Sequence, residues 1–277
     1  MEINIPLFNR TSIRIADISG NGFDYPTSQL QKGFLLIHDG QNMAEESVGF
    51  GVPVFKQGFR TIFAGDIELS YQRKASLWQV NTIYIMNLQE KIGRIGSGNI
   101  RSNLLYSIKN SLAAVHRTFP ILRRLLTSVS AMLRRILGWE TRYEPANFYV
   151  KIRVLYTIYA KEGKISVEVK IPDLSEGRIT EVLIMNEQGA HFFDCYLDSN
   201  GAKLKGNKIG SWDEVEAEEA SFLCARHHIK FTLTKINGAK LLRGQELIGS
   251  RLAWAGFGYS LSPSIRNFRY DLKLERV

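Results

Sequence analysis

Cysteines, transmembrane-length apolar runs and secretion signals are scarce or missing in this sequence of 277 residues. Cys195 and Cys224 are the two cysteines. We expect reduced thiols in a core or on a strand, because a disulfide would need an oxidising compartment. No uninterrupted apolar run reaches the roughly 18 residues that a membrane-spanning helix requires. The first residues, MEINIPLFNR, lack the pattern of a signal peptide, so we expect a cytoplasmic location.

The motifs of well-known catalytic and metal sites are also missing. The chain has no G-x-S-x-G, H-E-x-x-H or P-loop. None of its five histidines has a second histidine at metal-binding spacing with a third ligand nearby. We therefore predict no metal and no cofactor, and the sequence leaves open whether the protein is an enzyme. Nothing in it fixes the oligomeric state.

Acidic residues are absent between Arg101 and Trp139, and this absence locates the charge of the molecule. The net charge is +9, and this window supplies seven of the cations behind it: Arg101, Lys109, Arg117, Arg123, Arg124, Arg134 and Arg135. The rest of the chain is nearly neutral. The protein is therefore a neutral body with one basic segment, and charge-driven binding would concentrate there.

The stretch FPILRRLLTSVSAMLRRILGW, residues 119–139, has apolar residues at helical spacing. At 100° per residue, its leucines share one face and its arginines the other. The arginines that would contact an anionic surface are Arg123, Arg124, Arg134 and Arg135. Two interpretations stay open: the leucine face packs on a sheet, or it lies in an anionic membrane interface or over an apolar ligand. Nucleic acid is disfavoured, because the strip lacks lysine and interleaved aromatic residues.

Strand signals fill most of the remaining chain. In ANFYVKIRVLYTIYA, apolar residues alternate with polar ones, and the turn KEGK leads into a second alternating run, ISVEVKI. The pattern predicts a long antiparallel hairpin, and residues 267–275 predict a further strand. We also expect the segments 178–186 and 190–197 to form a pair, and the Asn237-Gly238 turn to close another hairpin.

These patterns define the predicted fold class and its organisation. The chain is mainly β, an antiparallel β-sandwich with a basic amphipathic helical insertion. We predict that residues 1–98 form the first part of the sandwich, 99–140 the insertion and 141–277 the second part.

The hairpin YTIYAKEGKISVEVKI and the strands after it resemble the sheets of large β-sandwich carbohydrate-active proteins, of the mutarotase and polysaccharide-lyase type. The resemblance covers residues 147–277 and extends to the strand rhythm, without a matching catalytic motif. It implies a carbohydrate partner. In such folds, a His or Tyr base near an arginine would abstract a sugar proton or open a sugar ring.

Candidate binding residues come from two polar and aromatic clusters and from the histidines. The stretch RLAWAGFGYS offers aromatic rings for stacking on a sugar, and HDGQNMAEESVGFGVP, residues 38–53, gathers His38, Asp39 and further polar groups. We predict as ligand-binding residues Arg251, Trp254, Tyr259, His191 and His227. Two functions therefore remain open: a carbohydrate-binding or carbohydrate-processing sandwich, and a peripheral membrane or lipid-binding protein that acts through residues 119–139.

Overall fold

The architecture is that of a computed structural model, which describes residues 1–8, 10–17, 32–44, 49–58, 60–94, 139–175, 177–248 and 251–277. Within these residues the chain is mainly β, as the sequence predicts, and every strand pair is antiparallel. The described residues contain a single helical element, the 3-10 turn η4 (Gly206–Ile209). None of the helices in this part is long and apolar enough to cross a membrane.

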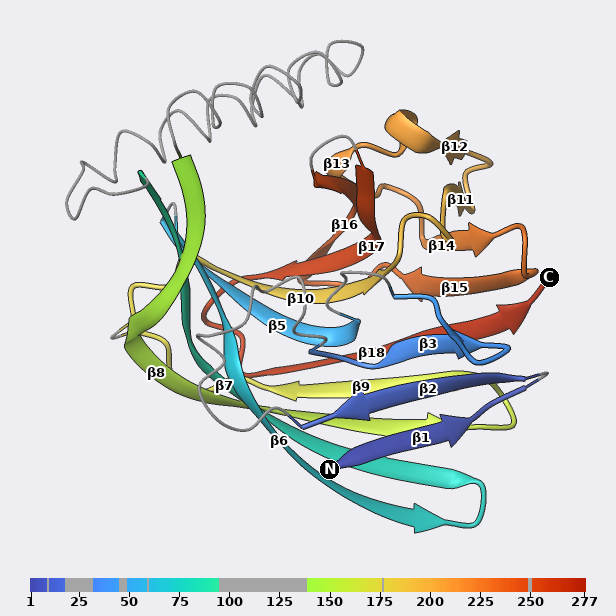
Figure 1. The fold of residues 1–277 in the computed structure, drawn as a ribbon, viewed down its shortest axis with the longest axis horizontal. Coiled ribbons are helices and arrows are strands. Elements are labelled where there is room, and N and C mark those ends of the chain that lie inside the picture. Colours follow the sequence, from blue (N-terminus) through green and yellow to red (C-terminus); the bar gives the residue numbers. More distant parts are fainter. Residues whose placement is uncertain are drawn as a thin grey trace.

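The strands form two sheets (Figure 1). The smaller sheet holds β1 (Glu2–Pro6), β2 (Thr11–Ala16), β3 (Leu35–His38) and β4 (Gln41–Asn42). The larger sheet has 14 strands, in the spatial order β12 (Lys203–Lys205), β11 (Cys195–Asp198), β14 (Glu219–Cys224), β15 (Ile229–Thr234), β18 (Asn267–Arg276), β9 (Lys164–Lys170), β8 (Trp139–Tyr159), β7 (Leu77–Arg94), β6 (Arg60–Lys74), β5 (Phe50–Gln57), β10 (Glu181–Gln188), β17 (Arg251–Leu261), β16 (Ala239–Ile248) and β13 (Ser211–Glu214).

The two halves of the large sheet face each other and share one apolar core. The long strands β6, β7 and β8 curve between the halves (Figure 1). Across the core, the ring of Phe257 on β17 lies 5.9 Å from that of Phe231 on β15, and Tyr259 lies 4.8 Å from Tyr270 on β18. The smaller sheet adds Ile5 and other buried side chains to the same core. The arrangement is thus sandwich-like.

The hairpin predicted over residues 146–171 is confirmed. β8 and β9 pair from Arg153↔Lys170 to Tyr159↔Lys164, and the turn contains Gly163 at a φ of +62°. Ile152, Val154, Tyr156 and Ile158 are fully buried, whereas Lys151 and Arg153 face solvent. Each buried aliphatic side chain contributes roughly 1.5–3 kcal/mol relative to exposure, so the alternation fixes which face of the hairpin turns inward.

Two other predicted pairings are wrong. The Asn237-Gly238 turn does form, with Gly238 at a φ of +83°. It connects β15, which pairs with β14 and β18, to β16, which pairs with β13 and β17. The turn therefore carries the chain between the two halves instead of closing a hairpin. Likewise, β10 pairs with β5 and β17, and β11 pairs with β12 and β14.

The predicted helical insertion is not seen among the described residues. Residues 95–138, which include Arg123, Arg124, Arg134 and Arg135, lie outside them. The flanking residues are described: Arg94 at the end of β7 pairs with Trp139 at the start of β8. Residues 95–138 therefore connect the ends of two paired strands, and Trp139 belongs to a strand.

A buried polar network crosses the centre of the core. The hydroxyls of Tyr84 and Tyr156 lie 2.8 Å apart, and Tyr156 Oη donates to the carbonyl of Gly51 at 2.9 Å. Asn186 Oδ1 accepts bonds from the backbone N–H of Gly51 at 3.1 Å and from Tyr270 Oη at 2.8 Å. Burial raises the pKa of Tyr156 well above its usual value, so the hydroxyl stays protonated and donates. The network ties β8, β10 and β18 to the β5 backbone.

Candidate functional site

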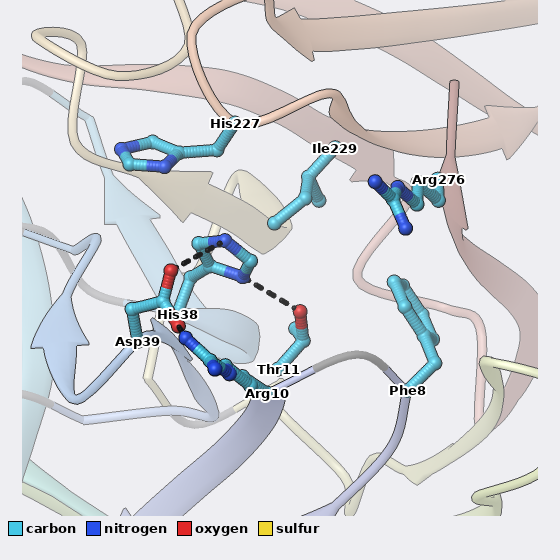
Figure 2. A pocket seen from close by; sticks show the side chains of 8 residues that line it. All are labelled: Phe8, Arg10, Thr11, His38, Asp39, His227, Ile229 and Arg276. Atoms are coloured by element: carbon cyan, nitrogen blue, oxygen red, sulfur yellow. Dashed lines mark hydrogen bonds and ion pairs between the residues drawn. The ribbon is translucent and has the colours of Figure 1, made fainter.

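A cavity of about 300 Å³ opens where the small sheet meets one end of the large one (Figure 2). Its walls come from four parts of the chain: the β1–β2 turn, the β3–β4 turn, the segment that leads into β15, and the end of β18. The lining residues are Phe8, Arg10, Thr11, His38, Asp39, His227, Ile229 and Arg276. A volume of this size is at the lower end of the range for small-molecule sites, roughly 300–1,000 Å³.

The β3–β4 turn positions the polar floor of the cavity. Asp39 and Gly40 have φ values of +49° and +77°, as the two central residues of a type I′ turn do, and Asp-Gly is a favoured sequence for this turn. The turn contacts the β1–β2 turn, because the backbone N–H of Asp39 donates to the carbonyl of Arg10 at 3.1 Å. Arg10 itself has a φ of +59°. This conformation costs a residue other than glycine roughly 1–2 kcal/mol.

His38 is held on both sides of its ring. Its Nδ1 lies 2.9 Å from Thr11 Oγ1, and its Nε2 lies 3.4 Å from Asp39 Oδ2. The other oxygen of the same carboxylate, Asp39 Oδ1, lies 3.3 Å from Arg10 Nη1. These contacts fix the orientation of the His38 ring, and Figure 2 shows the chain of contacts from Thr11 through His38 and Asp39 to Arg10.

His227 reaches the same cavity from the opposite layer. Its ring centroid lies 5.0 Å from that of His38, at an interplanar angle of 62°. Burial, and then the positive potential of His38 and Arg226, lowers the pKa of His227 below its usual 6.5. Its imidazole is therefore mainly neutral at neutral pH. Nε2 of His227 is buried and has no hydrogen-bond partner among the described residues.

Of the candidate residues from the sequence, His227 lines the cavity and His191 lies near it. The exposed ring of His191 is 5.5 Å from Phe192, whose ring is 6.1 Å from His227. His38 and Asp39, from the polar stretch that begins at residue 38, line the cavity as well.

The aromatic candidates lie elsewhere. Tyr259 is fully buried, and its hydroxyl donates to the carbonyl of Thr234 at 2.6 Å, at the end of β15 away from His227. Trp254 is 8% exposed and packs on Trp212, with ring centroids 4.7 Å apart. Arg251 is the first residue of β17, and its side chain lies outside the described part. The structure thus does not bring Tyr259 to the cavity that holds His227.

The sequence alone did not identify five of the cavity residues, namely Phe8, Arg10, Thr11, Ile229 and Arg276. The sequence pattern did contain a signal for one of them, Arg276. In the last strand, Phe268, Tyr270, Leu272 and Leu274 point inward, and Arg276 occupies the next position in the same alternation. Arg276 is exposed, so the signal is the change from apolar residues to a cation at the end of this row.

The described residues contain no group of three or more His, Cys, Asp or Glu side chains placed to hold a metal ion. Cys195 and Cys224 are both buried free thiols.

No protein-family model and no curated protein matches this chain. Solved structures do. One is α-N-acetylgalactosaminidase NagBb from Bifidobacterium bifidum in complex with Gal-NHAc-DNJ, with 10% identity over 99% of this chain and 36% of that chain, and a TM-score of 0.48. Another is a galactose mutarotase-like protein from Lactobacillus casei, with 13% identity over 99% of both chains and a TM-score of 0.40. A third is an α-galactosidase from Lactobacillus brevis, with 6% identity, a TM-score of 0.42, and coverage of 99% of this chain and 39% of that chain.

These likenesses are at the level of the fold, and their sequence identities are low. Galactosidases and the mutarotase type that residues 147–277 resemble are both among the matched structures. The chain spans only about a third of the length of the first solved structures that it matches. With TM-scores below 0.5, the likenesses transfer no site and no activity to this chain.

Proposed function

We propose that this protein binds a carbohydrate in the cavity between the two histidines and Phe8, and that the histidines exchange protons with it. One observation carries the proposal. Two imidazoles from distant parts of the chain, His38 and His227, lie 5.0 Å apart in the wall of a cavity that also holds two arginines.

The electrostatics of His227 support proton transfer. A general base must be unprotonated at the working pH, and the lowered pKa of His227 keeps it so near neutrality. The ring of His38 is held in one orientation by Thr11 and Asp39, which suits a group that must meet a substrate in a fixed geometry. A ligand in the cavity beside the two imidazoles could lose a proton to one of them and gain a proton from the other.

The shape and chemistry of the cavity support a sugar as the ligand. Phe8 provides an apolar surface against which the C–H groups of a sugar can pack. Arg10, Thr11 and Asp39 provide donors and acceptors for hydroxyl groups on the other side. With about 300 Å³, the site suits a small ligand such as a monosaccharide or the end of a chain.

The test has a binding arm and a reaction arm. Isothermal titration calorimetry would measure binding of glucose, galactose, N-acetylgalactosamine and their acidic forms to the wild type and to the His38→Ala and His227→Ala variants. Exchange NMR would follow anomer interconversion of each sugar. We expect binding that both substitutions weaken, and exchange that His227→Ala slows. His191→Ala removes an exposed histidine outside the cavity wall and serves as the matched control.

Absence of binding for every sugar, with a folded protein by circular dichroism, contradicts the proposal. If a sugar binds but its anomers do not interconvert faster, the carbohydrate site stands and the proposed proton transfer to these sugars is contradicted.

A further inference from the structure

Arg276 is an exposed residue at the end of β18, on the strand face whose preceding residues enter the core. On β18, the buried residues are Phe268, Tyr270, Leu272 and Leu274, and Arg276 is next in their row. Its register partner on β15 is Ile229, which is 1% exposed and also lines the cavity. Figure 2 shows the guanidinium beside Ile229 and opposite the ring of Phe8. The row of buried residues therefore ends at an exposed cation in the cavity wall.

The acidic residues of the same strand are on its other face. Glu275 lies 3.3 Å from Lys230 and 3.8 Å from Lys273, and Asp271 lies 3.0 Å from Lys164. Because successive side chains of a strand point to opposite faces, none of these carboxylates is on the face of Arg276. Among the described residues, no hydrogen bond or ion pair reaches the Arg276 guanidinium.

The acidic group of the cavity wall is also engaged. Asp39 contacts Arg10 through one oxygen and His38 through the other. The permanent charges of Arg10 and Asp39 cancel, so the permanent charge that remains among the lining residues is that of Arg276. The cavity therefore holds a net positive charge, with a guanidinium whose donors are available to a ligand.

We infer that the carbohydrate bound in this cavity carries an anionic group, a carboxylate or a phosphate, and that Arg276 binds this group. The inference rests on the proposed function and specifies its ligand. A guanidinium presents its N–H donors in a planar fork that matches both acidic groups with two parallel hydrogen bonds. The adjacent Phe8 and histidines would then contact the sugar ring. Arg276 is thus a specificity-determining residue.

The experiment compares matched ligands. Calorimetry would measure the binding of glucose, glucuronate and glucose 6-phosphate, and of galactose, galacturonate and galactose 6-phosphate, with acetate and inorganic phosphate as anions without a sugar. We expect an acidic sugar to bind roughly ten- to a hundredfold more tightly than its neutral counterpart, as a charge-assisted hydrogen bond implies. The carboxylate and phosphate arms tell which anion is preferred.

Variants separate the role of Arg276 from a general loss of charge. Arg276→Gln should remove the preference for the acidic sugar and leave neutral-sugar binding nearly unchanged, and Arg276→Lys should retain part of the preference. Arg269→Gln, at an exposed position on the outer face of the same strand, is the control for net charge. Thermal unfolding of each variant checks that the fold is intact.

Equal binding of acidic and neutral sugars overturns this inference and leaves the proposed function standing. An acidic preference that survives Arg276→Gln also overturns it. Failure of every sugar to bind removes the proposed function itself, and binding of acetate or phosphate as tight as that of the acidic sugars shows a simple anion site, which contradicts both.

Discussion

Polar side chains occupy both the centre of the core and the wall of the cavity, but only those in the centre are all buried. In the centre, Tyr84, Tyr156, Tyr270 and Asn186 satisfy one another and the backbone of Gly51. Such a network holds strands together, because each buried polar group has a partner.

At the cavity, by contrast, some polar groups have no partner. His227 Nε2 is buried without a partner among the described residues, and the guanidinium of Arg276 faces the cavity without an acid. Arg10, Asp39 and His228 have positive φ values of +59°, +49° and +53°. Unpaired polar groups and strained backbone cost stability, and they gather at sites that bind or react. The paired network suits a structural role for the first region, and the unpaired groups of the second support the ligand site that we propose there.

The strongest test of the central network is Gly51→Ala. Gly51 has a φ of +78°, and an added Cβ would meet the ring of Tyr156. We expect the free energy of unfolding to fall by roughly 2–5 kcal/mol, from backbone strain and displacement of the tyrosine. Urea denaturation measures the change.

Gly58→Ala is the matched control. Gly58 has a φ of +59° but nothing within 4 Å of an added Cβ. It should cost only the backbone term, roughly 1–2 kcal/mol. Equal losses for the two variants would mean that the tyrosine network does not constrain β5.

Substitution of the two cavity histidines should affect ligand binding more than stability, whereas Gly51→Ala should mainly lower the stability. We expect His38→Ala and His227→Ala to weaken sugar binding roughly ten- to a hundredfold, because each removes a hydrogen-bonding group from the site. Their free energies of unfolding should stay within about 1 kcal/mol of the wild type, as is usual for partly exposed positions. A large loss of stability with unchanged binding would reverse the assignment of the two regions.

Arg10→Gly probes the strain at the cavity. Glycine adopts a φ of +59° without penalty but costs entropy in the unfolded chain, so we expect a change between zero and a gain of about 1 kcal/mol in stability. Sugar binding should weaken, because Asp39 loses the guanidinium that holds it. Denaturation of this variant measures the change in its stability, and calorimetry of the same variant measures the change in its sugar affinity. Stronger binding by the glycine variant would contradict the role of Arg10 in positioning Asp39.

The smallest effect is the pH dependence due to His227. Its pKa is lower in the folded protein than its ordinary value of 6.5, so the unfolded chain binds the proton more readily. The stability that neutral His227 contributes is therefore present above pH 6.5 and is lost as the pH falls through the folded pKa. Between pH 7.5 and 5.5, the wild type should lose slightly more stability than His227→Gln. If His227 is the base of a sugar reaction, the rate should fall on acidification only below pH 6.5. A fall in rate that begins above pH 6.5 would contradict this assignment.

Much of the fold could be predicted where the signal is local. The β8–β9 hairpin and β18 follow from a two-residue alternation and a short turn, which fix the inward face without knowledge of distant partners. The Asn237-Gly238 turn shows the limit. The Asn-Gly sequence predicts that the chain reverses direction. It does not predict the partners of β15 and β16, which are set by the packing of β18 and β17, later in the sequence.

The candidate site shows the same limit more strongly. His227 could be named from the sequence, but its neighbour His38 is on another layer, and their 5.0 Å contact depends on how the small sheet packs on the large one. Tyr259 looked equally suitable for a sugar, yet it is part of the core. Arg276 was detectable in principle, because it interrupts the apolar row of the last strand.

The most direct test of the sugar site is the response of the histidine ring signals in NMR spectra during titration with the sugar that binds most tightly in calorimetry. Our account predicts that the resonances of His38 and His227 shift together and saturate with the calorimetric affinity, while those of His228, exposed beside the site, change less. Saturable binding that leaves both His38 and His227 unshifted would contradict it.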